Sequence, residues 1–217
     1  MQWEAAPLFA TPLFKLQLGN TDAVRDYFHD RIKAETDVRD EADALAHYYS
    51  RGGLFSAHPT LEPLRRSLEE AGTFVYRELM NFGASGPMRL TSAWFNLCHV
   101  GGSQSAHNHT NSLLSGTLYL HADANTYLDF FHPLDAPSLH AELHDVPSDA
   151  PNAHGLRFHK RTSRIRVTSG DLLLWPSALR HGYGANQTPD RLTLSFNMMP
   201  ERLNIDYQPF TGAGDGA

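Results

Sequence analysis

The sequence has a single cysteine, Cys98, and so cannot form an intramolecular disulfide framework. Its first residues lack the basic and apolar segments of a secretory signal peptide. No apolar run approaches the roughly 20 residues that a membrane-spanning helix needs. We therefore expect a protein of the reducing cytoplasm that does not enter a membrane.

Positive charge is also in short supply. The chain has 18 basic and 24 acidic residues, which gives a formal net charge of −6. A surface that binds nucleic acid of any sequence needs basic patches, so nucleic acid is not an expected partner. A nucleic-acid substrate held in a local groove stays open at this stage.

The chain is long enough for a full domain and is rich in histidine. Its 217 residues are enough to bury a full core, and we expect one domain over residues 1–217. Most of the 13 histidines are expected to be surface or packing residues. Six of these are scattered in and near one proline-rich segment and are interpreted as solvated: His121, His132, His140, His144, His154 and His159.

Residues 1–87 are expected to form a strand and two helices that cover the outside of the core. Residues 3–19 alternate proline with short apolar runs, which indicates an extended lead-in and an early strand. Apolar residues recur at helical spacing over residues 22–35 and again from residue 59 to residue 82, so both ranges predict helices. Residues 36–58 predict a loop with a short helix.

From residue 88 the pattern changes to short strands separated by turn residues, and we expect the core over residues 88–200. Strands are predicted at residues 88–100, 107–119, 127–131, 164–168, 172–175 and 191–198. Such strands are typical of an antiparallel sandwich or barrel. Residues 132–160 predict a long loop, a candidate lid or substrate element, and residues 211–217 predict a disordered tail.

His107 and His109 stand one residue apart in a stretch that predicts a strand. Residues i and i+2 of a strand point to the same face, with Cα atoms about 7 Å apart, a separation that suits two ligands of one metal ion. His181, after the strand over residues 172–175 and a short turn, is the candidate third ligand. The spacing therefore predicts a three-histidine metal site.

Arg191 begins a strand whose side chains alternate between an apolar and a polar face. The polar face consists of Arg191, Thr193, Ser195 and Asn197. Arginine suits bidentate binding of a carboxylate, so this face predicts a wet cavity for an anion. The same parity puts one further polar set on the face of the two histidines: Asn111, Ser115, Thr117 and Tyr119.

Four motifs follow one another along the chain. They are His107-x-His109, then Asn111-Ser-Leu-Leu-Ser-Gly-Thr-Leu-Tyr-Leu120, then Gly170-Asp-Leu-Leu-Leu-Trp-Pro-Ser-x-x-x-His181, then Arg191-x-Thr-x-Ser-Phe-Asn197. The set resembles the 2-oxoglutarate/Fe(II)-dependent oxygenases of the small bacterial and phage type, over roughly residues 88–200. The resemblance implies a mainly β protein with N-terminal helices on a double-stranded β-helix (jelly-roll, cupin-like) core. It also implies a dioxygenase, a hydroxylase that uses Fe(II), 2-oxoglutarate and oxygen on an unidentified substrate.

The resemblance also implies roles for single residues. His107, His109 and His181 would be the iron ligands; Arg191, assisted by Thr193 or Tyr119, would bind the distal carboxylate of 2-oxoglutarate; and Asn197 and Asn96 would be further pocket residues. His109 departs from the pattern, because the usual ligand set is two histidines and one carboxylate.

Three histidines plus water also describe a catalytic zinc site. Two alternatives therefore stay open. One is a three-histidine cupin-type metalloenzyme that does not use 2-oxoglutarate. The other is a non-catalytic β-sandwich that binds a metal or another ligand.

Overall fold

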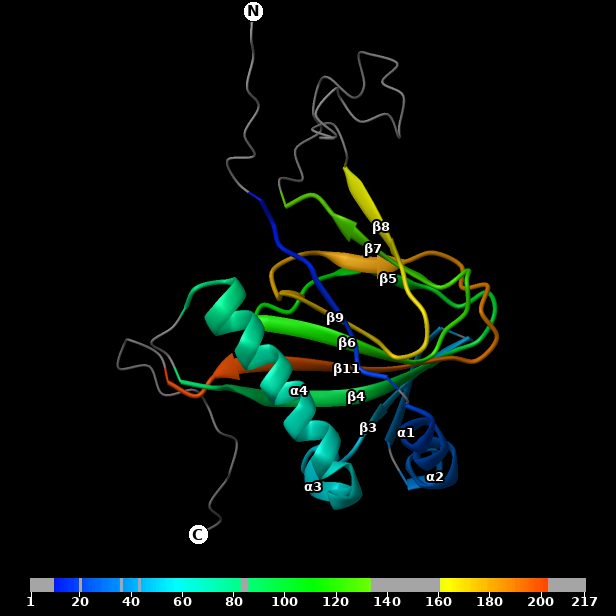
Figure 1. Ribbon diagram of the computed structural model, residues 1–217. Coiled ribbons are helices and arrows are strands. Elements are labelled where there is room, and N and C mark those ends of the chain that lie inside the picture. Colours follow the sequence, from blue (N-terminus) through cyan, green and yellow to red (C-terminus); the bar gives the residue numbers. More distant parts are fainter. Residues whose placement is uncertain are drawn as a thin grey trace, which may run out of the picture.

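Two antiparallel β-sheets stacked on one another form the centre of the molecule (Figure 1). The computed structural model describes residues 10–19, 21–35, 37–42, 44–82, 86–133 and 161–202. Helices lie against the larger sheet on the side away from the smaller sheet. The predicted fold class, mainly β with N-terminal helices, is confirmed.

The larger sheet has seven strands in the order β1-β9-β6-β11-β4-β3-β2. Their bounds are β1 Phe14–Gln17, β9 Asp171–Pro176, β6 Leu114–His121, β11 Arg191–Pro200, β4 Met88–Cys98, β3 Leu45–Tyr49 and β2 Asp37–Ala42. Strand β11 lies at the centre and pairs with β6 on one side and β4 on the other. Two ladders therefore fix where its side chains point.

The smaller sheet has four strands in the order β5-β10-β7-β8. Their bounds are β5 Gln104–His107, β10 His181–Tyr183, β7 Tyr127–Phe131 and β8 Thr162–Arg166. In the ladder between β5 and β10, His181 is the direct partner of His107. Strand pairing thus brings together two histidines that are far apart in the sequence.

Both predicted helices are present. The first runs without a break over residues 22–35 as α1 (Asp22–Tyr27), a π-helical turn η1 (Phe28–Ile32) and α2 (Lys33–Glu35). After α3 (Leu54–Ala57), the second runs over residues 59–79 as a 3-10 turn η2 (Pro59–Leu61), α4 (Glu62–Phe74) and a π-helical turn η3 (Val75–Leu79). It ends three residues before the predicted end, at Leu79.

Alternation along β11 divides the two sides of the larger sheet. Leu194 and Phe196 belong to the same buried cluster as Leu68 of α4, under the helices. Arg191 and Thr193 are also buried, but they line a cavity between the sheets. The polar face predicted for this strand is therefore directed to the interior of the sandwich.

The prediction of one strand from His107 to Tyr119 is wrong. Strand β5 ends at His107 in the smaller sheet, and β6 begins at Leu114 in the larger sheet. The residues between them are rich in Asn, Ser and Thr, whose side chains bond to the nearby backbone and favour turns. The chain uses this turn to cross from one sheet to the other.

The prediction of a loop over residues 36–58 is also wrong, although its short helix is present as α3. Strands β2 and β3 form a hairpin there, and β3 pairs with β4. The strand pattern of this short segment is weak, and β4 supplies the hydrogen bonds that make β3 part of the sheet. The predicted loop beyond residue 133, up to residue 160, and the tail at 211–217 lie outside the described residues.

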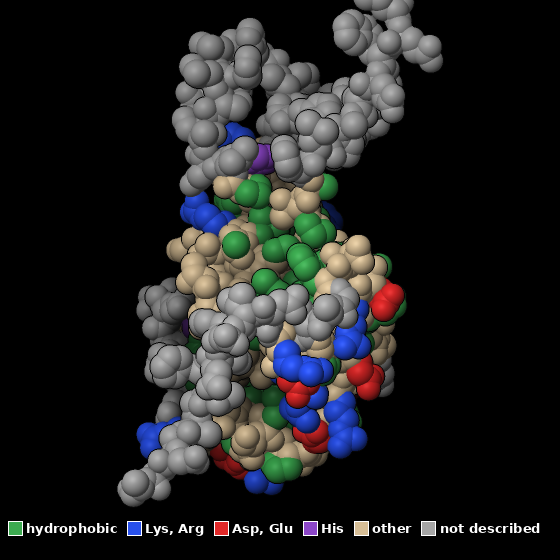
Figure 2. Space-filling model, turned by 90° about the vertical axis from the view of Figure 1, so that its left-hand side faces the viewer, with side chains coloured by type: hydrophobic (Ala, Val, Ile, Leu, Met, Phe, Trp, Pro, Cys, Tyr) green, Lys and Arg blue, Asp and Glu red, His purple; other side chains and the backbone are tan. Residues whose placement is uncertain are grey.

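Charges are mixed rather than gathered by sign on the face drawn in Figure 2. The described ion pairs of α4 follow the same pattern: Arg65 contacts Glu62 at 2.6 Å and Glu69 at 2.9 Å. Among the described helices, none combines the length and apolar character that a membrane span requires.

Candidate active site

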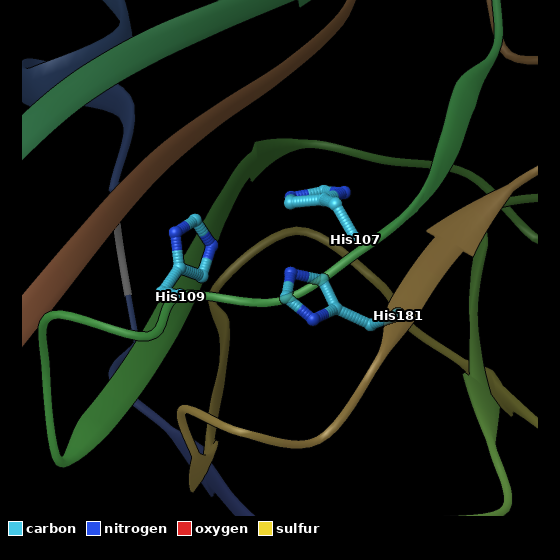
Figure 3. Close-up of side chains that lie close together, drawn as sticks. All are labelled: His107, His109 and His181. Atoms are coloured by element: carbon cyan, nitrogen blue, oxygen red, sulfur yellow. The ribbon is translucent and has the colours of Figure 1, made fainter.

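Three histidines converge between the sheets (Figure 3). His107 ends β5, His109 lies on the loop that follows, and His181 begins β10. Each histidine has one ring nitrogen that lies within 4.8 Å of a ring nitrogen of each of the other two histidines. The ring centroids are 5.1 Å apart for His107 and His109, 4.4 Å for His107 and His181, and 5.3 Å for His109 and His181. This is the spacing of a set that can bind one metal ion.

Hydrogen bonds orient two of these rings. The Nδ1–H of His107 donates to the backbone carbonyl of Ser105 at 2.9 Å. The Nδ1–H of His181 donates to the carbonyl of Leu179 at 3.0 Å. Each bond fixes the tautomer and leaves Nε2 with a free lone pair, which is the arrangement usual for metal-binding histidines.

Burial keeps the rings of His109 and His181 neutral. Burial, with a smaller contribution from the neighbouring His107, lowers the pKa of His181 to about 3 and that of His109 to about 4. Neutral imidazole is the form that binds metal, because a protonated ring has no lone pair to give. At neutral pH these two histidines are therefore ready to act as ligands.

His109 is positioned by a turn and not by the strand that the sequence predicted. Its backbone N–H donates to the carbonyl of Ser177, in the turn between β9 and β10, at 2.9 Å. Its ring lies 5.8 Å from that of Trp94, centroid to centroid. The convergence of the two neighbouring histidines was predicted, but a turn rather than strand alternation produces it.

Arg191 is the buried cation of the same cavity. It is 4% exposed, and its guanidinium carbon lies 3.6 Å from the ring centroid of Tyr183 and 5.5 Å from that of Tyr119. No carboxylate of the described residues forms an ion pair with it. Burying a charge without a counter-charge is costly, so the site favours an anionic ligand.

Two further donors in the cavity have no hydrogen-bond partner among the described residues. They are the hydroxyl of Tyr119 and the indole N–H of Trp175, which are 0% and 1% exposed. Burial raises the pKa of Tyr119, so its phenol stays protonated and able to donate. Buried donors are normally paired, and these two are free to bind a polar ligand. Tyr119 was predicted as a pocket residue from the sequence, whereas Trp175 was not.

A hydrogen-bonded row of polar side chains forms one wall of the cavity. The Nδ2 of Asn96 donates to the hydroxyls of Thr193 at 3.1 Å and Ser195 at 2.9 Å. The Oδ1 of Asn96 lies 2.5 Å from Nδ1 of His47 in β3. His47 was missed because its segment was predicted as a loop, and only the pairing of β3 with β4 brings it here.

The residues around this cavity come from both sheets, and Asn197 is not among them. The cavity holds about 410 Å³ of empty space, its open mouth included. It is lined by Trp94, Asn96, Gln104, His107, His109, Gly116, Thr117, Tyr119, Leu128, Trp175, His181, Tyr183, Arg191, Thr193, Ser195 and Phe196. Of the predicted pocket residues, Asn96, Tyr119, Arg191 and Thr193 thus meet the three histidines in one cavity.

A two-sheet β fold with three converging histidines and a buried arginine in one cavity defines a metal-binding protein that can accept an anion. Residues 92–197 match the family described as "Putative 2OG-Fe(II) oxygenase". The chain belongs to this family of oxidoreductases, with Fe(II) as its metal and 2-oxoglutarate as its co-substrate. The donor set fits both, since three imidazoles can bind iron and the unpaired Arg191 can receive a carboxylate.

Solved structures of similar fold support the double-stranded β-helix assignment. The epimerase SnoN of nogalamycin biosynthesis superposes with a TM-score of 0.61 at 16% identity, over 94% of this chain and 85% of that one. HygX of Streptomyces hygroscopicus, with nickel, 2-oxoglutarate and hygromycin B bound, gives 0.58 at 17% identity over 88% and 84%. A prolyl-4-hydroxylase of Pseudomonas putida gives 0.52 at 13% identity over 86% and 92%. No curated protein matches the sequence.

Proposed function

We propose that this protein is an Fe(II)- and 2-oxoglutarate-dependent dioxygenase that hydroxylates an organic substrate, with iron bound by His107, His109 and His181. The observation that carries the proposal is Arg191, a buried cation without a described carboxylate partner, in the same cavity as three converging imidazoles. A ligand for this cavity needs an anionic end for the arginine and donor atoms for a metal. 2-Oxoglutarate has a carboxylate at one end and a keto acid at the other.

The side chains around Arg191 would complete the binding of the distal carboxylate. The Tyr119 hydroxyl is a protonated donor that awaits a partner. The Thr193 hydroxyl accepts from Asn96, so its own proton is available for a ligand. Hydrogen bonds to a charged group contribute more than neutral ones, about 1.5–3 kcal/mol each. Arg191, Tyr119 and Thr193 together would hold this end of the co-substrate.

The histidines set the charge at the other end. When bound, Fe(II) and 2-oxoglutarate supply, with oxygen, the oxidising power that replaces a C–H bond by C–OH. The chain's own part is to provide three neutral ligands, which leave the charge of the metal uncompensated and so favour an anionic co-substrate. His109 stands where a carboxylate is usual, and it strengthens this attraction.

The alternative function, a three-histidine metalloenzyme that does not use 2-oxoglutarate, provides no anionic ligand for Arg191. A zinc site of that kind binds a water and has no need of a buried guanidinium in the same cavity. Hydroxylation is proposed as the reaction because it needs only the metal site, 2-oxoglutarate, oxygen and a substrate C–H bond. The named relatives include an epimerase as well as a hydroxylase, so the fold itself suits more than one outcome.

Anaerobic titration of the apo-protein with Fe(II), and then with 2-oxoglutarate, tests the proposal. We expect a visible charge-transfer band when 2-oxoglutarate joins bound iron. In the Arg191→Ala protein the band should appear only at much higher 2-oxoglutarate concentration.

Arg66→Ala is the matched control, because Arg66 is exposed and, among the described residues, forms an ion pair with Glu62 on its own helix alone. Its titration should follow that of the wild type. Iron bound without any band in the wild type would remove the 2-oxoglutarate assignment and leave the zinc-like rival.

A further inference from the structure

The turn between β9 and β10 supports two of the three histidines at once. The carbonyl of Ser177 accepts the backbone N–H of His109 at 2.9 Å, and its own N–H donates to the carbonyl of Leu113 at 3.0 Å. Two residues further on, the carbonyl of Leu179 accepts Nδ1–H of His181 at 3.0 Å. A shift of this turn would therefore move His109 through its backbone and His181 through its ring.

A chain of hydroxyl groups anchors the same turn to the larger sheet. The Ser177 hydroxyl lies 2.7 Å from that of Ser112 and 2.8 Å from that of Ser115. The Ser115 hydroxyl lies 2.8 Å from Oδ1 of Asn197, whose Nδ2 donates to Ser92 at 3.1 Å. The chain thus links the loop after β5, the turn after β9, and the strands β6, β11 and β4.

The proton order along this chain follows from the chemistry of its end. An amide oxygen can only accept, so Ser115 must donate to Asn197. The Ser115 hydroxyl is also the donor to Ser177, so its proton is shared between the two acceptors. The Ser112 hydroxyl donates to the carbonyl of Leu114 at 2.9 Å, so the bond between Ser177 and Ser112 uses the proton of Ser177. The donors therefore run from Ser115 on β6, through Ser177, to the loop that carries His109.

These groups act at a distance from the cavity. Ser177 and Ser115 are 1% exposed and Asn197 is 5% exposed, so water cannot replace a bond that is lost. None of the three lines the cavity. Removing one partner would leave buried polar groups unsatisfied, and the loop and turn would be free to shift toward other partners.

We propose that Ser177, Ser115 and Asn197 form a positioning network that sets the separation of His109 and His181, and through it the metal affinity. The inference rests on the proposed function only in taking these histidines as metal ligands. It gives Asn197 a task different from the pocket role expected from sequence. Substitutions of residues that orient metal ligands commonly lower affinity about 10–100-fold, and we expect Ser177→Ala to fall in this range.

The test measures the Kd of the full-length apo-protein for Co(II) and for Fe(II) under nitrogen, together with the visible spectrum of the Co(II) form. Ser177→Ala should weaken binding about 10-fold or more and change the Co(II) spectrum, which reports ligand geometry. Ser177→Thr keeps the hydroxyl and should recover most of the affinity. Asn197→Ala should act in the same direction as Ser177→Ala.

Thr126→Val is the matched control for lost stability. Thr126 is also buried, and its hydroxyl bonds to Thr188 at 2.7 Å in a network that includes none of the three histidines. With thermal stability measured for each variant, Thr126→Val should keep the wild-type Kd and Co(II) spectrum at a comparable loss of stability. An equal change in Thr126→Val and Ser177→Ala would overturn the positioning role.

The outcome separates this inference from the proposed function. A Kd for Ser177→Ala within twofold of the wild type, with the 2-oxoglutarate band intact in the wild type, overturns the network and leaves the function standing. Weaker metal binding in Ser177→Ala without any band in the wild type supports the network and removes the 2-oxoglutarate assignment.

Discussion

The two ends of the cavity are built differently. The metal end takes its histidines from strand ends and a loop, and backbone carbonyls hold two of the rings. The arginine end rests on β11, which is hydrogen-bonded to strands on both sides along most of its length. A loop can move without disturbing a sheet, whereas β11 cannot. We therefore expect substitutions at the metal end to change metal affinity, and substitutions at the arginine end to change 2-oxoglutarate binding alone.

The largest effect is expected from removing a histidine. His181→Ala takes away the most buried ligand candidate, which the pairing of β10 with β5 also places beside His107. Metal affinity should fall by more than the roughly 10–100-fold typical of residues outside a ligand set, and activity should be lost with it. Titration calorimetry and metal analysis of the purified protein measure the change.

His29→Ala is the control for this substitution, because His29 is an exposed histidine on the N-terminal helical segment. It should keep the wild-type metal content. Equal metal content in His181→Ala and the wild type would mean that the metal ligands are assigned to the wrong residues.

The next effect tests the arginine end. Arg191→Met keeps much of the side-chain volume and removes the charge, so the KM for 2-oxoglutarate should rise about 10–100-fold while metal affinity stays within twofold. The apo-protein should lose little stability or gain some, since a buried charge without a described carboxylate partner costs free energy. Steady-state kinetics with 2-oxoglutarate, metal titration and thermal unfolding measure the three quantities. A parallel fall in metal affinity would show that the two ends are not independent.

The sequence predicted the arginine end better than the metal end for the same structural reason. Alternation with period two is a local pattern, so the polar face of β11 could be derived from residues 191–197 alone. The place of His109 depends on a bond to Ser177, 68 positions away in the sequence, and no local pattern contains such a contact. The three histidines were found from their spacing, while the geometry that joins them was not.

Two residues at or beside the cavity, His47 and Trp175, were missed for different reasons. His47 stands in a segment predicted as a loop, and β3 exists as part of the sheet because β4 pairs with it. Trp175 was not predicted as a pocket residue because tryptophan in an apolar strand usually packs in the core, and only its surroundings show that its indole N–H has no partner among the described residues. Tertiary contacts decided both cases.

The smallest effect concerns the link between β3 and the arginine end. Asn96 uses its Nδ2 for Thr193 and Ser195, so its Oδ1 must accept from Nδ1–H of His47. His47→Phe keeps an aromatic ring and removes that donor, which frees the amide to turn away from Thr193. The loss of one hydrogen bond, about 0.5–1.5 kcal/mol, corresponds to about a 2–10-fold weaker Kd for 2-oxoglutarate.

A double-mutant cycle decides whether His47 acts through Asn96. If it does, Asn96→Ala should weaken 2-oxoglutarate binding by at least as much as His47→Phe, and the double variant should be no weaker than Asn96→Ala, because residues that act in series are not additive. Metal affinity should stay unchanged in all three variants, since no described hydrogen bond joins this row to the histidines of the metal end. Additive effects would make His47 a separate contributor. A shift in metal affinity would mean that β3 supports the metal end as well, and the division of the cavity into two independent ends would fail.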